Sequence, residues 1–186
     1  MIYFLIILCL IVVFLVGIYN GLVRNQQQVQ EAWSTIDTQL KRRYDLIPNL
    51  METVRGYMQH EQKTLEAVVQ ARANAMSVAK TDVAKKQANE NALSNALKSV
   101  FALSENYPDL KANENFLALQ QELSDTETKI QAARQFYNTI VSSFNTKVKS
   151  FPSNLVANMF QFKEAHFFEL GEAEREAVQK APEVKF

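Results

Sequence analysis

The first 23 residues form an uninterrupted run of uncharged, mostly apolar positions, MIYFLIILCLIVVFLVGIYNGLV. At a rise of about 1.5 Å per residue, a helix of this length spans a hydrocarbon layer about 30 Å thick. A cleaved signal peptide would carry a cationic start and a small-x-small cleavage site, and neither is present. The pattern therefore predicts an uncleaved membrane anchor, with Tyr3 and Tyr19 near its two ends.

Beyond this run, apolar residues recur at alternating steps of four and three, the spacing of a helix that packs at a shallow angle. One series predicts a helix that continues from the anchor, and it comprises Val29, Trp33, Ile36, Leu40, Arg43, Ile47, Leu50, Val54 and Tyr57. A second predicts a helix from about Pro108 to Ser150, and it comprises Phe116, Leu119, Leu123, Thr126, Ile130, Ala133, Tyr137, Ile140, Phe144, then Lys147 or Val148, and Phe151. Two long helices with wide apolar stripes are expected to pack lengthwise.

The region between these two helices is rich in alanine and only weakly apolar. It predicts two thinner helices, about Gln62 to Lys80 and Val83 to Glu105. A turn at Thr81-Asp82 would join them, and the Asp82 carboxylate is a good cap for the helix that follows. Small alanine faces bury little area, so we expect this hairpin to be the less stable half of the bundle.

After Pro152 the sequence SNLVANMFQFKEAHFFEL concentrates Phe160, Phe162, Phe167 and Phe168 in a short stretch. One interpretation is a final helix or strap that closes the bundle. The other is an exposed aromatic surface for a partner subunit or a membrane. The Glu-rich end of the chain, 171–186, is expected to be a flexible tail.

Only four Gly and four Pro occur among 186 residues, which favours long helices with few tight turns. We therefore predict an all-α fold in which an N-terminal transmembrane helix continues into an antiparallel bundle of about four long helices plus a short C-terminal helix. The predicted parts are an anchor at 1–23, a helical bundle at 24–158, an aromatic-rich segment at 159–170 and a tail at 171–186.

Charge placement bears on partners and on orientation. The 20 Lys and Arg residues equal the 20 Asp and Glu residues, so net charge gives no support to a nucleic-acid-binding surface. Nothing basic precedes the anchor, whereas Arg24, Lys41, Arg42 and Arg43 follow it. The positive-inside rule then predicts an N-terminus outside the cell and a cytoplasmic bundle, with a periplasmic bundle as the alternative.

Candidate chemistry is sparse. His60-Glu61 resembles the start of a zinc-protease motif, but position 64, where the second histidine would stand, is Thr64. His166 is the only other histidine, and the single cysteine, Cys9, lies inside the anchor. No Gly-rich phosphate loop or nucleophile elbow is present. We predict no catalytic residues, no metal site, no cofactor and no enzymatic activity.

Arg43 is the unusual residue of the first series, because it puts a cation on the packed stripe. An unpaired buried guanidinium is very costly, so Arg43 needs a carboxylate partner. Glu127 and Glu122 flank the second stripe, and we expect Arg43 to pair with one of them. By the same reasoning Arg134 would pair with Asp37 or Glu127, completing a polar layer that fixes helix register.

Several stretches of this sequence together resemble the LemA family of bacterial membrane proteins. They are YNGLV (19–23), VQEAWSTIDTQLKRRYDLIPNLMETVRGYMQHE (29–61), YPDLKANENFLALQQELSDTETKIQAARQFYNTIV (107–141) and FPSNLVANMFQF (151–162). The resemblance implies an uncleaved anchor followed by an antiparallel helical bundle. It implies no reaction, because the family has no established biochemical activity. Relatives in magnetosome-forming bacteria are linked to membrane invagination, which suggests scaffolding at a membrane.

Our first functional hypothesis is a single-pass protein of the bacterial cell membrane that acts by interaction, through self-assembly, scaffolding or membrane organisation. The alternative is an adaptor or sensor that presents partners to a membrane protease or signalling protein. The expected partners are the lipid bilayer, further copies of the chain and other membrane proteins, with no nucleic acid. The candidate interaction surface comprises Lys41, Arg42, Phe160, Phe162, Phe167 and Phe168.

Overall fold

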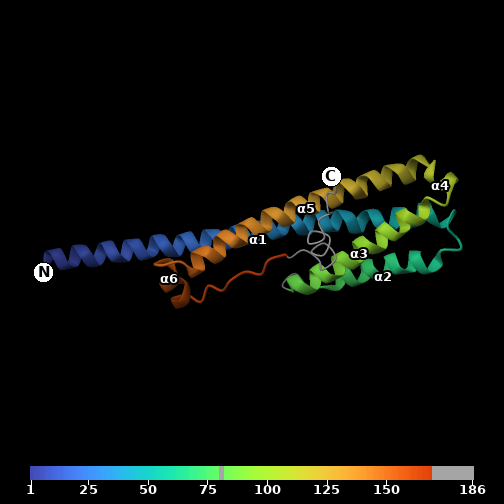
Figure 1. Cartoon of the computed structure of the whole chain (residues 1–186). Helices are drawn as coiled ribbons and strands as arrows, with labels where there is room; N and C mark the ends of the chain where they lie inside the picture. The colour runs from blue at the N-terminus through green and yellow to red at the C-terminus, as the bar shows by residue number, and fades with distance from the viewer. Residues whose placement is uncertain (80–81, 169–186) are drawn as a thin grey trace, which may run out of the picture. The chain divides into compact units, whose positions relative to one another are not determined.

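The computed structural model describes residues 1–79 and 82–168 (Figure 1). The predicted tail at 171–186 and Thr81 of the predicted turn lie outside these ranges. The described residues form six α-helices, which confirms the all-α prediction. These are α1 (Ile2–Arg55), α2 (Gln62–Ser77), α3 (Val83–Ser104), α4 (Pro108–Lys111), α5 (Glu114–Lys149) and α6 (Ser153–Met159).

The chain divides into two compact units, each of which has its own core. The first unit contains Met1–Thr38 and Ile130–Phe167, and the described part of the second contains residues from Gln39–Lys129 together with Phe168. The core of the first unit comprises Leu22, Ala32, Ile36, Ile130, Ala133, Tyr137, Val141, Phe144, Val156 and Ala157. The core of the second comprises Leu40, Tyr44, Ile47, Leu50, Met51, Val54, Met58, Val68, Ala75, Val78, Leu93, Leu97, Val100, Leu110, Phe116, Leu123 and Phe168.

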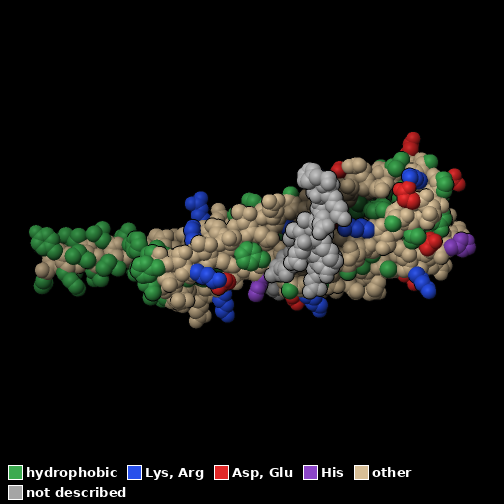
Figure 2. All heavy atoms as spheres, viewed as in Figure 1, with side chains coloured by type: hydrophobic (Ala, Val, Ile, Leu, Met, Phe, Trp, Pro, Cys, Tyr) green, Lys and Arg blue, Asp and Glu red, His purple; other side chains and the backbone are tan. Residues whose placement is uncertain are grey.

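The start of α1 has the character of a membrane helix. Its most apolar window has a mean hydropathy of 3.1, and none of that window is buried within the protein. Figure 2 shows hydrophobic side chains covering this end of the helix. From Leu22 onward the same helix carries buried residues on one face. The first 17 or so positions are thus suited to contact lipid, and the later ones contact protein.

The end of α1 differs from the prediction at one residue. The spacing predicts Tyr57 in the packed stripe, but Tyr57 is 39% exposed, whereas its neighbour Met58 is buried. The reason is that α1 ends at Arg55, so the residues from Gly56 onward no longer follow helical spacing. The amides of both Tyr57 and Met58 donate to the carbonyl of Val54, closing the end of the helix.

The predicted helix from Pro108 to Ser150 is in fact two helices. A single turn, α4, begins at Pro108, and α5 begins at Glu114. Asn113 explains the break, because its side-chain oxygen accepts a hydrogen bond from the amide of Phe116 at 3.1 Å and so caps a new helix. The predicted cap at Asp82 is confirmed, since its carboxylate accepts from the amide of Lys85 at 3.0 Å.

The first unit is closed by α6 and by a non-helical strap, residues 162–167, that runs back along α5 (Figure 1). Asn145 on α5 holds the strap through two hydrogen bonds of 2.9 Å, one to the carbonyl and one from the amide of Ala165. The Tyr137 hydroxyl donates to the carbonyl of His166 at 2.9 Å. Burial raises the pKa of the Tyr137 hydroxyl.

Candidate functional site

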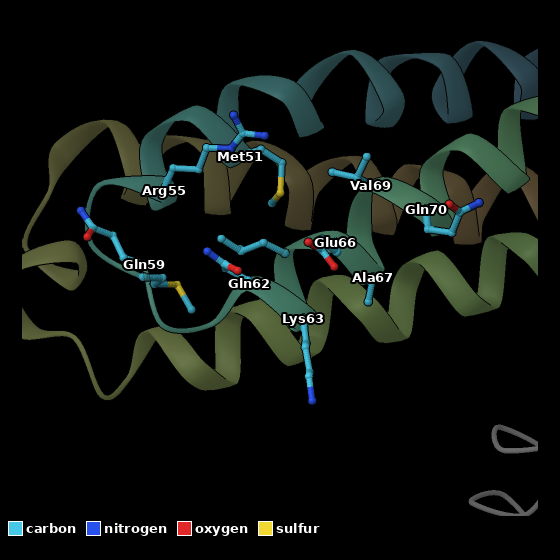
Figure 3. Close-up of a pocket in the computed structure, with 11 residues that line it drawn as sticks. Met51, Arg55, Gln59, Gln62, Lys63, Glu66, Ala67, Val69 and Gln70 are labelled. Carbon is cyan, nitrogen blue, oxygen red and sulfur yellow. The ribbon is translucent and has the colours of Figure 1, made fainter.

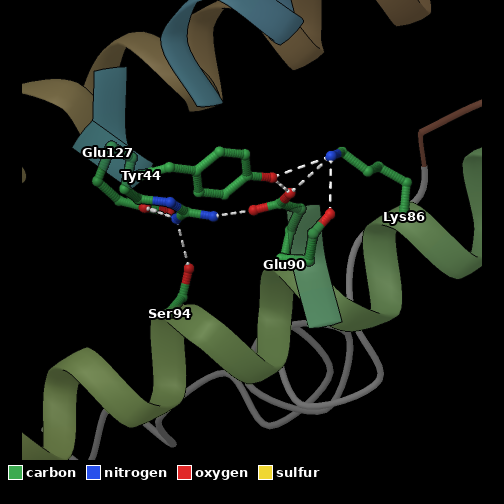
Figure 4. Close-up of polar contacts among 7 residues, drawn as sticks. Tyr44, Lys86, Glu90, Ser94 and Glu127 are labelled. Carbon is green, nitrogen blue, oxygen red and sulfur yellow. Dashed lines mark hydrogen bonds and ion pairs between the residues drawn. The ribbon is translucent and has the colours of Figure 1, made fainter. Parts of the chain in front are cut away.

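A buried polar network in the second unit surrounds Arg43 of α1. Its side chain is 1% exposed, and it is reached by side chains from two other helices (Figure 4). One terminal nitrogen, Nη1, donates to Glu127 Oε2 of α5 at 2.5 Å and to Ser94 Oγ of α3 at 2.8 Å. The other, Nη2, pairs with Glu90 Oε2 of α3. The guanidinium therefore joins three helices at one level.

The network extends from Glu90 to Tyr44 and Lys86. The Tyr44 hydroxyl donates to Glu90 Oε1, and it accepts a hydrogen bond of 3.0 Å from Lys86 Nζ. The same ammonium lies 3.4 Å from Glu90 Oε1 and donates to the carbonyl of Ala75 at 3.0 Å. The buried charge of Lys86 is thus held by a carboxylate, a hydroxyl and a carbonyl of the second unit.

The charges of this network balance. Arg43 and Lys86 carry two positive charges, and Glu90 and Glu127 carry two negative ones. Arg43, Lys86 and Glu90 are each at most 5% exposed, a position in which an unpaired ion would be very costly. The Arg43 Nε has no hydrogen-bond partner among the described residues, so pairing is extensive without being complete. Its geometry suits fixing the positions of three helices.

A second polar contact provides a hydrogen bond to a backbone carbonyl of α1 that lacks its helical partner. Pro48 lies inside the helix and has no amide hydrogen, so the carbonyl of Tyr44 loses its usual partner four residues on. Arg72 of α2 supplies a donor, with its Nε 2.8 Å from that carbonyl. The Pro48 ring itself is exposed. The proline thereby provides an acceptor that ties α2 to α1.

The predicted polar layer contains five residues, and the structure places them in different surroundings. Glu127 contacts Arg43, whereas Glu122 lies 3.6 Å from the exposed Arg42. Asp37 and Arg134 are half-buried members of the first unit, while the other three residues belong to the second.

Sequence reasoning missed Tyr44, Lys86, Glu90, Ser94 and Arg72. A signal for the α3 residues was present, because its buried positions follow steps of four and three: Lys86, Glu90, Leu93, Leu97, Val100 and Ser104. Two of these positions are charged, so the series was not recognised as a packed face. A cation on the packed face of one helix indicates that charged residues at core spacing on another helix, such as Glu90, are its partners.

The predicted interaction residues have unlike environments. Lys41 and Arg42 are exposed on α1. Phe160 is 55% exposed and Phe167 is 43% exposed, whereas Phe168 is 2% exposed. Phe162 is half-buried and packs against Leu22. The aromatic segment therefore buries Phe168 in the second unit and presents Phe160 and Phe167 of the first unit at the surface.

An open groove of about 1100 Å³ also lies in the second unit, between the end of α1 and the start of α2 (Figure 3). Methionine and long polar side chains line it, among them Met51, Arg55, Met58, Gln59 and Glu66. His60 is exposed and is not among the lining residues. Among the residues that the structure describes, no three His, Cys, Asp or Glu side chains gather in a way that could hold a metal.

A sequence model of the LemA family matches residues 32–186. The chain belongs to the LemA family. Protein LemA of Metamycoplasma hominis is 34% identical over 162 residues, which is 86% of this chain and 73% of that protein. This LemA-family chain is also similar to magnetosome proteins MamQ 1 and MamQ 2 of Paramagnetospirillum magneticum, at 29% identity over 75 residues. That match covers 40% of this chain and 28% of each magnetosome protein.

Arg43 and Glu90 should be strongly coupled in stability. Arg43→Met leaves Glu127 without its cation and removes one of the two cations beside Glu90, and it should cost about 3 kcal/mol or more. In a double-mutant cycle with Glu90→Gln, we expect a coupling of about 1 to 3 kcal/mol. The half-exposed pair Arg42 and Glu122 is the matched control, with about 0 to 1 kcal/mol expected for Arg42→Met and Glu122→Gln. Urea unfolding of the detergent-solubilised chain measures both; equal couplings would contradict this assignment.

The contribution of Arg72 to the free energy of unfolding should depend on Pro48. Arg72→Met should destabilise the protein by about 1 to 3 kcal/mol, because the Tyr44 carbonyl is left without a donor. Pro48→Ala restores an amide at position 48, so in that background the cost of Arg72→Met should fall by about 1 kcal/mol. The same unfolding assay applies, with the exposed Arg55→Met as control. An unchanged cost would show that Arg72 acts through other contacts.

Proposed function

We propose that this protein is a single-pass membrane protein that acts by interaction, as a self-assembling scaffold or an organiser of the bacterial cell membrane. The observation that carries the proposal is the division of α1. Its apolar start exposes large side chains such as Phe4, Ile7 and Phe14, whereas its later turns bury one face in protein. A single helix thus attaches a folded bundle to a bilayer.

The use of charge supports interaction over catalysis. The buried ions Arg43 and Lys86 both form ion pairs with Glu90, and none of these three residues lines the open groove near Met51. Catalytic groups need access to a substrate, whereas ions that join helices need only their partners. The exposed cations Lys41 and Arg42 form a surface suited to an acidic partner.

The similar proteins give further support to the proposal. Two of the similar proteins are named for the magnetosome. We infer a comparable role at a membrane for this chain, with other membrane proteins and further copies of itself as partners, no nucleic acid, and no cofactor.

Self-assembly predicts more than one copy per particle when the protein is extracted in detergent or nanodiscs. Light scattering should report a discrete multimer, and Lys41→Glu with Arg42→Glu should weaken it if this face contacts a neighbouring copy. The control, Lys63→Glu with Lys85→Glu, makes the same charge change at two exposed positions of α2 and α3. A strictly monomeric particle would reject self-assembly and favour an adaptor or sensor that presents partners to a membrane protease or signalling protein.

We propose further that the N-terminus is outside the cell and the bundle is cytoplasmic, since Arg24, Lys41 and Arg42 follow the anchor. In a Cys9→Ala background, Ser99→Cys should react with a membrane-impermeant maleimide only after cells are permeabilised. Ile2→Cys, at the opposite end of the anchor, should react in intact cells. The reverse pattern would assign the bundle to the periplasm.

A further inference from the structure

We propose that the outer face of α6 and its flanking residues dock onto the lipid bilayer at the C-terminal end of the anchor. This deepens the proposed function and rests on it, because it takes the start of α1 as membrane-spanning. The residues concerned, called here the docking face, are Phe151, Leu155, Met159 and Phe160. All of them belong to the first unit, as does the anchor.

The inner face of α6 fixes where the docking face lies. Val156 and Ala157 are buried against Leu22 of α1, and Ile18, Val148 and Phe162 complete this small core. Leu22 lies in the last turn of the uncharged N-terminal run. The packing therefore holds α6 beside the end of the anchor, which is where a spanning helix meets the lipid headgroups.

The outer face of α6 is unusually apolar for a surface next to water. Phe151 is 79% exposed, Met159 is 71% exposed, and Leu155 and Phe160 are 57% and 55% exposed. Phe151 was expected in the packed stripe of α5, but α5 ends at Lys149 and leaves its ring outside. Grouped large apolar side chains at a protein surface usually mark a binding surface.

Aromatic contacts join this face to the anchor directly. The ring of Tyr19 lies 4.7 Å from that of Phe160 and 5.9 Å from that of Phe162, measured between centroids. Tyr19 is near the end of the apolar run, where amphipathic rings favour the interfacial layer of a bilayer. Phe160 is thereby placed at the same depth as an interfacial tyrosine.

The charges around the docking face match a lipid surface. Residues 142–163 contain Lys147, Lys149 and Lys163 and no acidic residue, and Arg24 follows the anchor. These four cations are exposed, and Glu164, which lies 2.7 Å from Lys149, is the first acid after them. A basic rim around apolar side chains is the arrangement that binds an interface containing anionic lipids. Continuity with the anchor and this charge together favour lipid over a protein partner.

The test uses spin labels on the full chain in vesicles of neutral lipid with about 30% phosphatidylglycerol. Native Cys9 reports on the anchor. In a Cys9→Ala background, Met159→Cys and Leu155→Cys report on the docking face. Phe136→Cys is the matched control, because Phe136 is an equally exposed ring, 56%, on α5 of the same unit. Collisions with oxygen and with a water-soluble nickel chelate give the depth of each label.

We expect Cys9 to be deep in the bilayer, Phe136→Cys to be in water, and both docking-face labels to be at interfacial depth, with several-fold lower nickel collision rates than Phe136→Cys. Adding Lys149→Gln and Lys163→Gln should raise the nickel accessibility of the Met159 label several-fold in anionic vesicles. Lys63→Gln with Lys85→Gln, the control pair in the second unit, should leave it unchanged.

Other outcomes overturn the proposal in distinguishable ways. A deep Cys9 label with water-exposed labels at positions 155 and 159 would reject docking and leave the anchor intact. A water-exposed Cys9 label would reject the anchor, and with it the proposed function. Labels at 155 and 159 that are shielded from both oxygen and nickel, with dipolar broadening between copies, would show that a second chain covers this face instead of lipid.

Discussion

The second unit depends on one constraint, the need to neutralise the buried cation of Arg43. A guanidinium that is 1% exposed is tolerated only with carboxylates beside it. Glu90 and Glu127 come from different helices, so both α3 and α5 must lie against α1 at the level of Arg43. Sliding either helix by one turn would move its carboxylate by about 5.4 Å and leave an ion unpaired. The network therefore selects a single register for surfaces that alanine alone would specify weakly.

Lys86 shows how the requirement propagates. Glu90 accepts from Arg43 through one oxygen and from Tyr44 through the other, and Lys86 lies within 3.4 Å of that second oxygen. The ammonium also holds the carbonyl of Ala75, near the end of α2. The Arg72 side chain reaches the Tyr44 carbonyl that Pro48 leaves open. Each thin helix of the hairpin is thus tied to α1 by a hydrogen bond or ion pair that compensates for its small apolar face.

The spacing of apolar residues in the sequence predicts some parts of this structure and not others. Spacing locates long apolar stripes, so it predicts α1, the body of α5 and the position of Arg43 on a packed face. It also predicts that the partner of Arg43 is an acid flanking the second stripe, and Glu127 is such an acid. It cannot identify Glu90, because a charged residue at core spacing on an alanine-rich helix looks like solvated surface until its partner is known. The wrong predictions for Tyr57 and Phe151 have a different cause. The helices α1 and α5 end at Arg55 and Lys149, before these two residues, so neither residue lies on the packed face that its spacing predicts.

The two units place their charges and rings in opposite ways. In the second, two cations and two anions are brought together so that little net charge remains in the core. In the first, Arg24, Lys147, Lys149 and Lys163 stay exposed around apolar side chains that find no cover within the unit. A soluble protein would gain by burying Phe151 and Met159, because each exposed large side chain forgoes about 1.5 to 3 kcal/mol. Their exposure is consistent with a surrounding medium, beside the anchor, that is itself apolar.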